Sequence, residues 1–167
     1  MSFHLYLMRH AKSDWSDQGL SDYDRPLNSR GQKNAKQIGQ WMAKNDFLPD
    51  KIISSAAVRA RQTAELLVQQ LDHLDLEDIQ YEKDLYLASI DVLIEHIQLY
   101  KGDSKGLMLI AHNPGMEHLV NFLMKKDTGM INMTTANLAI FKYTDSIFDP
   151  EIDKGDLIEL IRPRELK

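Results

Sequence analysis

The sequence predicts an α/β protein, a three-layer α/β/α fold whose central sheet is mainly parallel, with residues 1–167 forming a single domain. Apolar segments of strand length alternate with segments of helical periodicity along most of the chain, and two strand-like segments follow at its end. This alternation favours right-handed crossovers, which place helices on both faces of the sheet. A chain of 167 residues is long enough to bury a core of this kind.

The first part of the chain predicts a strand, a long loop and a helix. Residues 3–8 are aromatic and aliphatic and contain no turn former, which favours a buried strand. Residues 11–27 are rich in aspartate, serine, glycine and proline, which indicates a long loop, and loops of that length are usually functional. Residues 28–45 have apolar side chains at helical spacing, with Asn28 or Ser29 as the N-cap.

The middle of the chain repeats the strand-and-helix pattern. Residues 51–54 predict a short strand, and a helix with one apolar face starts near Ala56. Residues 79–81 predict a third strand, and Ser89 is placed to cap the helix after it.

The last part begins with the clearest buried strand, residues 106–111. Residues 113–115 open a further helix, and residues 138–143 and 157–161 are strand-like. We expect the tail at residues 162–164 to be exposed.

Charge and composition exclude several classes of function. The formal net charge of −5 disfavours nucleic acid and anionic membranes as partners. The absence of cysteine excludes disulfides, thiolate nucleophiles and cysteine-based metal sites. No apolar run reaches the roughly 18 residues of a membrane span, and the N-terminus lacks the pattern of a signal peptide, so we expect a cytoplasmic protein.

Candidate catalytic residues follow the predicted strands. Ligands of open α/β sheets bind beyond the carboxyl ends of the strands, where Arg9, His10, Ser55, Arg59 and His112 are expected. Two guanidinium groups would repel a divalent cation, whereas their planar forks match phosphate oxygens. This edge therefore predicts a phosphoryl site without metal or other cofactor.

A histidine can perform the chemistry of such a site. A neutral imidazole is nucleophilic, so His10 could attack phosphorus while Arg9 and Arg59 stabilise the charge on the phosphoryl oxygens. His112 could donate a hydrogen bond to the group in transfer.

The motifs around these residues resemble the histidine phosphatase superfamily, also called phosphoglycerate mutase-like, and in particular its SixA-type phosphohistidine phosphatases. The similarity spans the chain from Phe3 to about Leu160. It is carried by Arg9-His10-Ala11, the block from Ser55 to Thr63, the block from Ala111 to Gly115, Asp24-Arg25-Pro26-Leu27 and Leu85-Tyr86.

The resemblance implies a phosphoglycerate mutase-like fold and a role for each matching residue. His10 would be the phosphorylated nucleophile, Arg9 and Arg59 would be phosphate ligands, and His112 would be the second histidine of the pocket.

Further positions match weaker parts of the family pattern. Arg25 would help to bind phosphate or substrate, although a loop ion pair with Asp22 and Asp24 explains it equally well. Ser13 and Ser16 fall where relatives place small polar phosphate ligands, and Asn113 adjoins His112. For Trp15, the sequence favours a cover at the edge of the core over a place at the pocket mouth.

Three positions depart from the family pattern. Ala11 replaces a glycine and Ala56 replaces a proline. Leu87 stands where many branches carry a glutamate that acts as a proton donor. Asp84 or an aspartate of the loop 14–24 could supply the proton instead.

A site without a strong acid suits the P–N bond of phosphohistidine, because the imidazole can leave already protonated. The sequence therefore predicts a phosphatase that acts on phosphohistidine in a protein partner through a covalent phosphohistidine intermediate. A phosphatase for a small phosphate ester and a non-catalytic phosphate-binding module are the alternatives.

Overall fold

The computed structural model describes residues 2–125, 129–144, 149 and 153–166. Its strands form one sheet in the order β3-β2-β4-β1-β5-β6. The first four strands of that order are parallel to one another. Strand β5 pairs antiparallel with β1, and β6 pairs antiparallel with β5. The strands are β1 (Phe3–Arg9), β2 (Lys51–Ser55), β3 (Ile79–Glu82), β4 (Gly106–Ala111), β5 (Leu138–Tyr143) and β6 (Asp156–Ile161).

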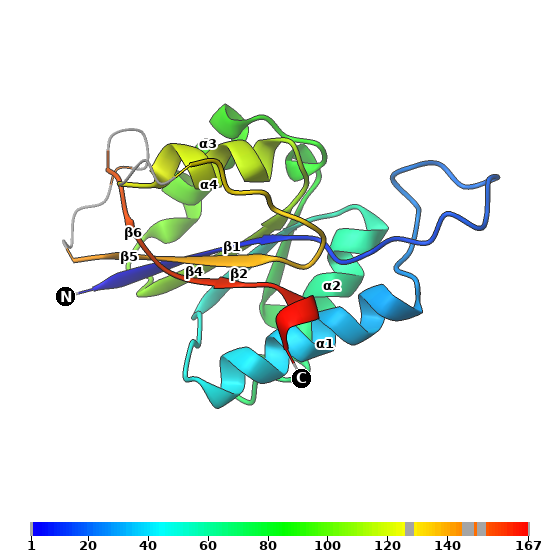
Figure 1. Ribbon diagram of the computed structural model, residues 1–167, viewed down its shortest axis with the longest axis horizontal. Coiled ribbons are helices and arrows are strands. Elements are labelled where there is room, and N and C mark those ends of the chain that lie inside the picture. Colours follow the sequence, from blue (N-terminus) through cyan, green and yellow to red (C-terminus); the bar gives the residue numbers. More distant parts are fainter. Residues whose placement is uncertain (1, 126–128, 145–148, 150–152, 167) are drawn as a thin grey trace.

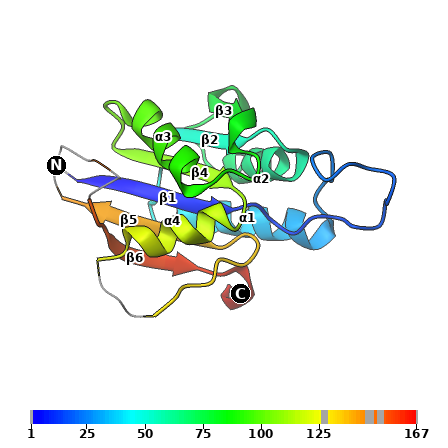
Figure 2. The ribbon, with the colours of Figure 1, turned by 90° about the horizontal axis from the view of Figure 1, so that it is seen from above.

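Helices cover both faces of the sheet, which confirms the predicted three-layer α/β/α fold. Helices α3 and α4 lie on one face, and α1 and α2 lie on the other (Figures 1 and 2). The α-helices are α1 (Ser29–Lys44), α2 (Val58–Val68), α3 (Ile90–Lys101) and α4 (Gly115–Leu123). Three short 3₁₀ turns accompany them, at η1 (Leu76–Asp78), η2 (Lys83–Leu85) and η3 (Pro163–Glu165).

The central strand β1 is apolar on both faces because it contributes to two cores. Leu5 and Leu7 pack with the side chains of α3 and α4, whereas Tyr6 and Met8 pack with those of α1 and α2. A strand whose side chains are buried on both faces of the sheet has a continuous apolar sequence. This burial fixes β1 firmly, so the residues at its end have defined positions.

The predicted elements are found, with small shifts at their ends. Strand β1 extends to Arg9, and α2 begins at Val58, two residues after Ala56. Asn28 caps α1, because its side chain accepts a hydrogen bond from the Gly31 amide at 2.8 Å. Residues 11–27 contain no helix or strand beyond one isolated bridge between Ser13 and Leu27.

The prediction of an exposed tail is wrong for Pro163. This residue is buried in η3, which lies across α1 (Figure 1), whereas Arg164 is exposed. The reason is that the neighbouring Leu166 packs against the core beneath α1 and α2 and pulls the turn onto the helix. Within the described part of the chain, no helix is long and apolar enough to cross a membrane.

Candidate active site

A cavity of about 190 Å³ opens at the carboxyl ends of β1 and β4. The long loop 11–27 extends beyond this edge of the sheet (Figure 1) and supplies part of the wall. The cavity is lined by Arg9, His10, Lys12, Ser13, Trp15, Asp22, Arg59, Leu87, His112, Asn113 and Thr135.

His10 has a defined tautomer. Its Nδ1 lies 2.7 Å from the carbonyl oxygen of Ala11, which can only accept, so Nδ1 carries the proton. Its Nε2 therefore holds the lone pair and accepts a hydrogen bond from Arg59 Nε at 3.3 Å. Burial, together with the charges of Arg59 and Arg9, lowers the pKa of His10 to about 4. His10 is thus a neutral imidazole at neutral pH.

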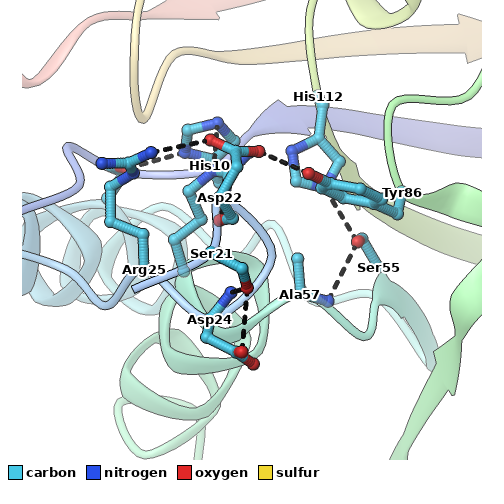
Figure 3. Close-up of polar contacts among 11 residues, drawn as sticks. His10, Ser21, Asp22, Asp24, Arg25, Ser55, Ala57, Tyr86 and His112 are labelled. Atoms are coloured by element: carbon cyan, nitrogen blue, oxygen red, sulfur yellow. Dashed lines mark hydrogen bonds and ion pairs between the residues drawn. The ribbon is translucent and has the colours of Figure 1, made fainter. Parts of the chain in front are cut away.

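His112 lies beside His10, with 5.0 Å between the ring centroids. Its Nε2 is 2.8 Å from Ser55 Oγ, and Ser55 Oγ accepts a hydrogen bond from the Ala57 amide (Figure 3). Its Nδ1 is buried and has no hydrogen-bond partner among the described residues. Burial and the neighbouring His10 and Arg59 lower the pKa of His112 to about 3, so this imidazole is also neutral.

Each nitrogen of the Arg59 guanidinium donates one hydrogen bond. Besides its bond to His10, it donates from Nη1 to the Asp22 carbonyl at 2.5 Å and from Nη2 to the Asp22 carboxylate at 3.0 Å. The side chain is buried, which places this charge in an environment of low dielectric.

Asp22 holds the centre of this network. Its carboxylate accepts hydrogen bonds from Arg59, from Arg25 Nη2 at 3.2 Å and from the Tyr86 hydroxyl (Figure 3). The Tyr86 hydrogen bond and the Arg59 guanidinium lower the pKa of Asp22 to about 2. Asp22 is therefore ionised at neutral pH. Its carboxylate lies between the guanidinium groups of Arg25 and Arg59, a position that suits an anion.

Arg9 completes the set of cations around the histidines. Its Nη1 donates to the Met133 carbonyl at 3.2 Å, and its Nε is buried without a hydrogen-bond partner in the described part of the chain. Burial lowers the pKa of Arg9. The structure thus brings Arg9, His10, Arg59 and His112 together around one cavity.

The other predicted ligands divide into two groups. Ser13 and Asn113 line the cavity, but the Asn113 amide already donates to the Met133 carbonyl at 2.7 Å. Arg25 and Ser16 do not line it. Arg25 is buried and pairs with Asp22, whereas Ser16 is exposed.

The ion pair predicted as an alternative for Arg25 forms with Asp22 only. Asp24 instead accepts a hydrogen bond from the Ser21 hydroxyl at 2.9 Å (Figure 3). Asp84 does not line the cavity either. Asp22 is the one carboxylate among the residues that line it.

The preferred prediction for Trp15, a cover at the edge of the core, is wrong. Its side chain is 63% exposed, and it lines the mouth of the cavity. The Arg25 guanidinium lies 3.5 Å from the centre of the Trp15 ring, a cation–π contact. This contact positions the indole at the surface, so the side chain does not pack into the core.

The departures from the family pattern have visible consequences. Among the described residues, Leu87 and two other non-glycine residues have positive φ, and Ala11 is not one of them. Ala11 therefore needs no glycine, and its amide donates to Thr63 Oγ1 at 3.0 Å. Leu87, with φ of 50°, lines the cavity and offers no proton.

Sequence reasoning missed several contributions to the cavity. It gave Asp22 no central role, and it did not assign Ser55 to His112 or Tyr86 to Asp22. Lys12 and Thr135 also line the cavity. The position of Lys12 at the cavity could have been predicted, because it directly follows the Arg9-His10-Ala11 motif. No feature of the sequence indicates that Thr135 lines the cavity.

The described residues contain no group of three or more histidine, aspartate or glutamate side chains that could hold a metal ion. Two neutral histidines and two arginines around one cavity at the strand ends of an α/β/α sheet are the marks of a phosphoryl-binding protein. The profile of the histidine phosphatase superfamily (branch 1) matches residues 5–86.

Two of the proteins similar in sequence are uncharacterized. An uncharacterized chloroplastic protein of Arabidopsis thaliana is 31% identical over 149 residues, which cover 85% of this chain and 67% of that protein. An uncharacterized protein of Mycobacterium tuberculosis is 36% identical over 108 residues, 64% of this chain and 63% of that protein. The chain belongs to the histidine phosphatase superfamily.

Solved structures of SixA type match the whole fold. A SixA protein from Agrobacterium tumefaciens is 29% identical, with a TM-score of 0.78 over 96% of this chain and 99% of that chain. The protein histidine phosphatase SixA complexed with tungstate, at 22% identity, has a TM-score of 0.81 over 99% of this chain and 100% of that chain. This second similarity bears on the fold alone.

Proposed function

We propose that this protein is a metal-independent phosphatase that removes the phosphoryl group from phosphohistidine in proteins. The observation that carries the proposal is the lone pair of Nε2 on the buried side chain of His10, which lines the cavity together with Arg9 and Arg59. A neutral imidazole held beside cations is a nucleophile suited to phosphorus.

The reaction has two steps. His10 Nε2 attacks phosphorus, and the P–N bond to the substrate imidazole breaks, leaving the electron pair on that imidazole. Water then attacks the phosphorus bound to His10, which releases inorganic phosphate and restores the lone pair on Nε2. Arg9 and Arg59 stabilise the charge on the phosphoryl oxygens in both steps.

His112 would donate a hydrogen bond to the phosphoryl group from Nδ1, the buried atom that has no partner. This tautomer requires Ser55 to donate its hydroxyl proton to Nε2. The oxygen of Ser55 already accepts from the Ala57 amide, so its proton is free for that bond. Ser55 is therefore a positioning residue.

The choice of phosphohistidine follows from what the cavity lacks. Asp22, the one carboxylate among the described residues that line the cavity, is ionised, and Leu87 cannot give a proton. An alkoxide needs a proton donor to leave, whereas the imidazole of phosphohistidine, already protonated on its other ring nitrogen, leaves as a neutral base when the P–N bond breaks. The volume of about 190 Å³ is below the usual range for small-molecule sites and suits a phosphorylated side chain.

The similarity to SixA-type structures also supports a protein substrate. The cytoplasmic location and the lack of a nucleic acid partner remain predictions from the sequence.

The test of the chemistry is release of inorganic phosphate from an aryl phosphate without added metal. We expect His10→Ala to lose at least about a thousandfold in kcat, since the nucleophile is removed. His118→Ala, at an exposed position of α4, is the matched control and should keep the wild-type rate. Equal rates for His10→Ala and the wild type would overturn the role of His10.

The test of the substrate compares histidine-phosphorylated proteins with a panel of sugar phosphates. We expect kcat/KM to favour the phosphoproteins by orders of magnitude. The reverse preference would establish a phosphatase for small esters, and binding without turnover of either class would establish a non-catalytic module.

A further inference from the structure

Helix α1 carries an uncompensated positive charge in an acidic protein. Its sixteen residues include Arg30, Lys33, Lys36 and Lys44 and no aspartate or glutamate, although the whole chain has a net charge of −5. All four side chains are exposed. The ion pairs among the described residues involve none of them.

These cations border a groove between α1 and the C-terminal turn. Figure 1 shows η3 lying across α1, and two cavities of about 510 and 250 Å³ follow the contact. The cavities share Lys33, Gln37 and Leu166, so they form one continuous depression, which we call the α1 groove. Arg164 lines it from the opposite side.

Two apolar side chains line the α1 groove beside the cations. Trp41 is half-buried, with its ring stacked on Phe47 at 5.3 Å between the ring centroids, and Leu166 is the second. An aromatic anchor within a polar rim is typical of protein interfaces.

The shape of the groove favours a helix as its occupant. The fifteen residues from Arg30 to Lys44 span about 21 Å at a rise of 1.5 Å per residue, which is about four turns of a partner helix. Arg30, Lys33, Gln37, Trp41 and Lys44 recur at intervals of three and four, so they share one face of α1. An acidic amphipathic helix would set its carboxylates against the lysines and its apolar stripe against Trp41.

The groove begins beside the catalytic cavity. The Asn28 amide donates to the carbonyl of Lys12 at 3.0 Å, and Gly31 packs closely against the same carbonyl. Lys12 lines the cavity, so the first turn of α1 adjoins the active site. A helix bound along α1 would therefore lie next to the cavity mouth.

We propose that the α1 groove binds an acidic amphipathic helix of the phosphohistidine protein on which the enzyme acts. This proposal rests on the proposed function, because it assigns the partner of the same site. It makes charge on α1 a determinant of KM for protein substrates and not of the chemistry at His10.

The first test is kinetic and uses Lys33→Glu/Lys36→Glu. We expect kcat/KM for a histidine-phosphorylated protein with an acidic helical face to fall at least tenfold, through KM, while hydrolysis of an aryl phosphate is unchanged. Lys105→Glu/Lys142→Glu is the matched control, because it makes the same change of charge far from the cavity. Lys105 and Lys142 lie at the ends of β4 and β5 that point away from the cavity. This control should change kcat/KM less than twofold.

The second test is direct binding. The probe is a synthetic amphipathic helix of about 16 residues, with glutamate at intervals of three and four and leucine between them, titrated at about 50 mM salt so that screening is weak. We expect the wild type and the control variant to bind it and Lys33→Glu/Lys36→Glu to bind at least tenfold more weakly. Anionic vesicles and a DNA duplex are the comparison ligands.

The outcomes separate the two proposals. A wild-type enzyme that hydrolyses no phosphohistidine protein would overturn the proposed function, and the peptide titration would still decide the groove. Equal peptide binding by the wild type and Lys33→Glu/Lys36→Glu, no binding by either, or tighter binding of vesicles or DNA would overturn the α1 groove as a helix site.

Discussion

Asp22 is the residue whose position says most about how the site works. Its carboxylate takes up donors of Arg59, which lines the cavity, and of Arg25, which does not. In the proposed function, a dianionic phosphoryl group beside an ionised aspartate meets repulsion, so we expect Asp22 to move away before Arg59 binds phosphate fully. Asp22 lies in the long loop 11–27, which contains no helix or strand to hold it.

Asp22→Asn should tighten the binding of phosphate. The amide keeps the shape of the side chain but removes the competing charge, so we expect the inhibition constant for inorganic phosphate or tungstate to fall about tenfold, or about 1.4 kcal/mol. Asp24→Asn is the control, since Asp24 is exposed and bonds to Ser21. Weaker inhibition in Asp22→Asn would mean that Asp22 orients the arginines for phosphate, contrary to this view.

The sequence was informative about residues whose chemistry is local. Arg9 ends a buried strand and His10 follows it, and their types alone indicate phosphate chemistry. The roles of Asp22, Ser55 and Tyr86 depend on contacts between segments far apart in the chain. The hydroxyl of Tyr86, for example, reaches Asp22 across 64 positions, and no pattern in the sequence specifies that contact.

At the scale of elements, the start of α1 is coupled to the active site. A Cβ atom at Gly31 would lie 2.1 Å from the carbonyl oxygen of Lys12, which is backbone and cannot rotate away. Glycine is therefore required for the close approach of α1 to the segment that follows His10.

Gly31→Ala should destabilise the protein and disturb the cavity together. We expect a loss of about 2 kcal/mol or more in the free energy of unfolding, since the backbone has to shift. The rate on an aryl phosphate should also fall. Gly19→Ala is the control, because the nearest atom there is a side-chain oxygen of Asp17 at 3.2 Å in an exposed turn. A Gly31→Ala protein with wild-type stability and rate would contradict the coupling.

Elements were predictable where their burial is simple. Strands β1 and β4 are covered on both faces, and their continuous apolar runs identified them. The tail was not predictable, because η3 is placed by the packing of Leu166 against a core built from α1 and α2. That contact is long-range, and the polar residues around Pro163 gave no sign of it.

At the scale of the whole molecule, two buried neutral histidines link stability to pH. The pKa of His10 is lowered from 6.5 to about 4, and that of His112 from 6.5 to about 3. Between those values and 6.5 the unfolded chain binds more protons than the folded one, so stability falls as the pH falls. Asp22 affects stability only at lower pH. The stability it contributes is complete above its unfolded pKa of 3.8 and is lost as the pH falls toward its folded pKa of about 2.

The free energy of unfolding should therefore drop between pH 7 and about pH 5, by about 2 kcal/mol for each histidine. Urea titrations at the two pH values measure this difference. His10→Asn and His112→Asn should each reduce this drop by about 2 kcal/mol, because the asparagine binds no proton in the unfolded chain that folding would have to remove. His118→Asn, at an exposed position, should keep the wild-type dependence. A wild-type stability that is flat across this range would show that the imidazoles are not buried as neutral groups, and with that the lone pair of His10 would lose its physical basis as the nucleophile.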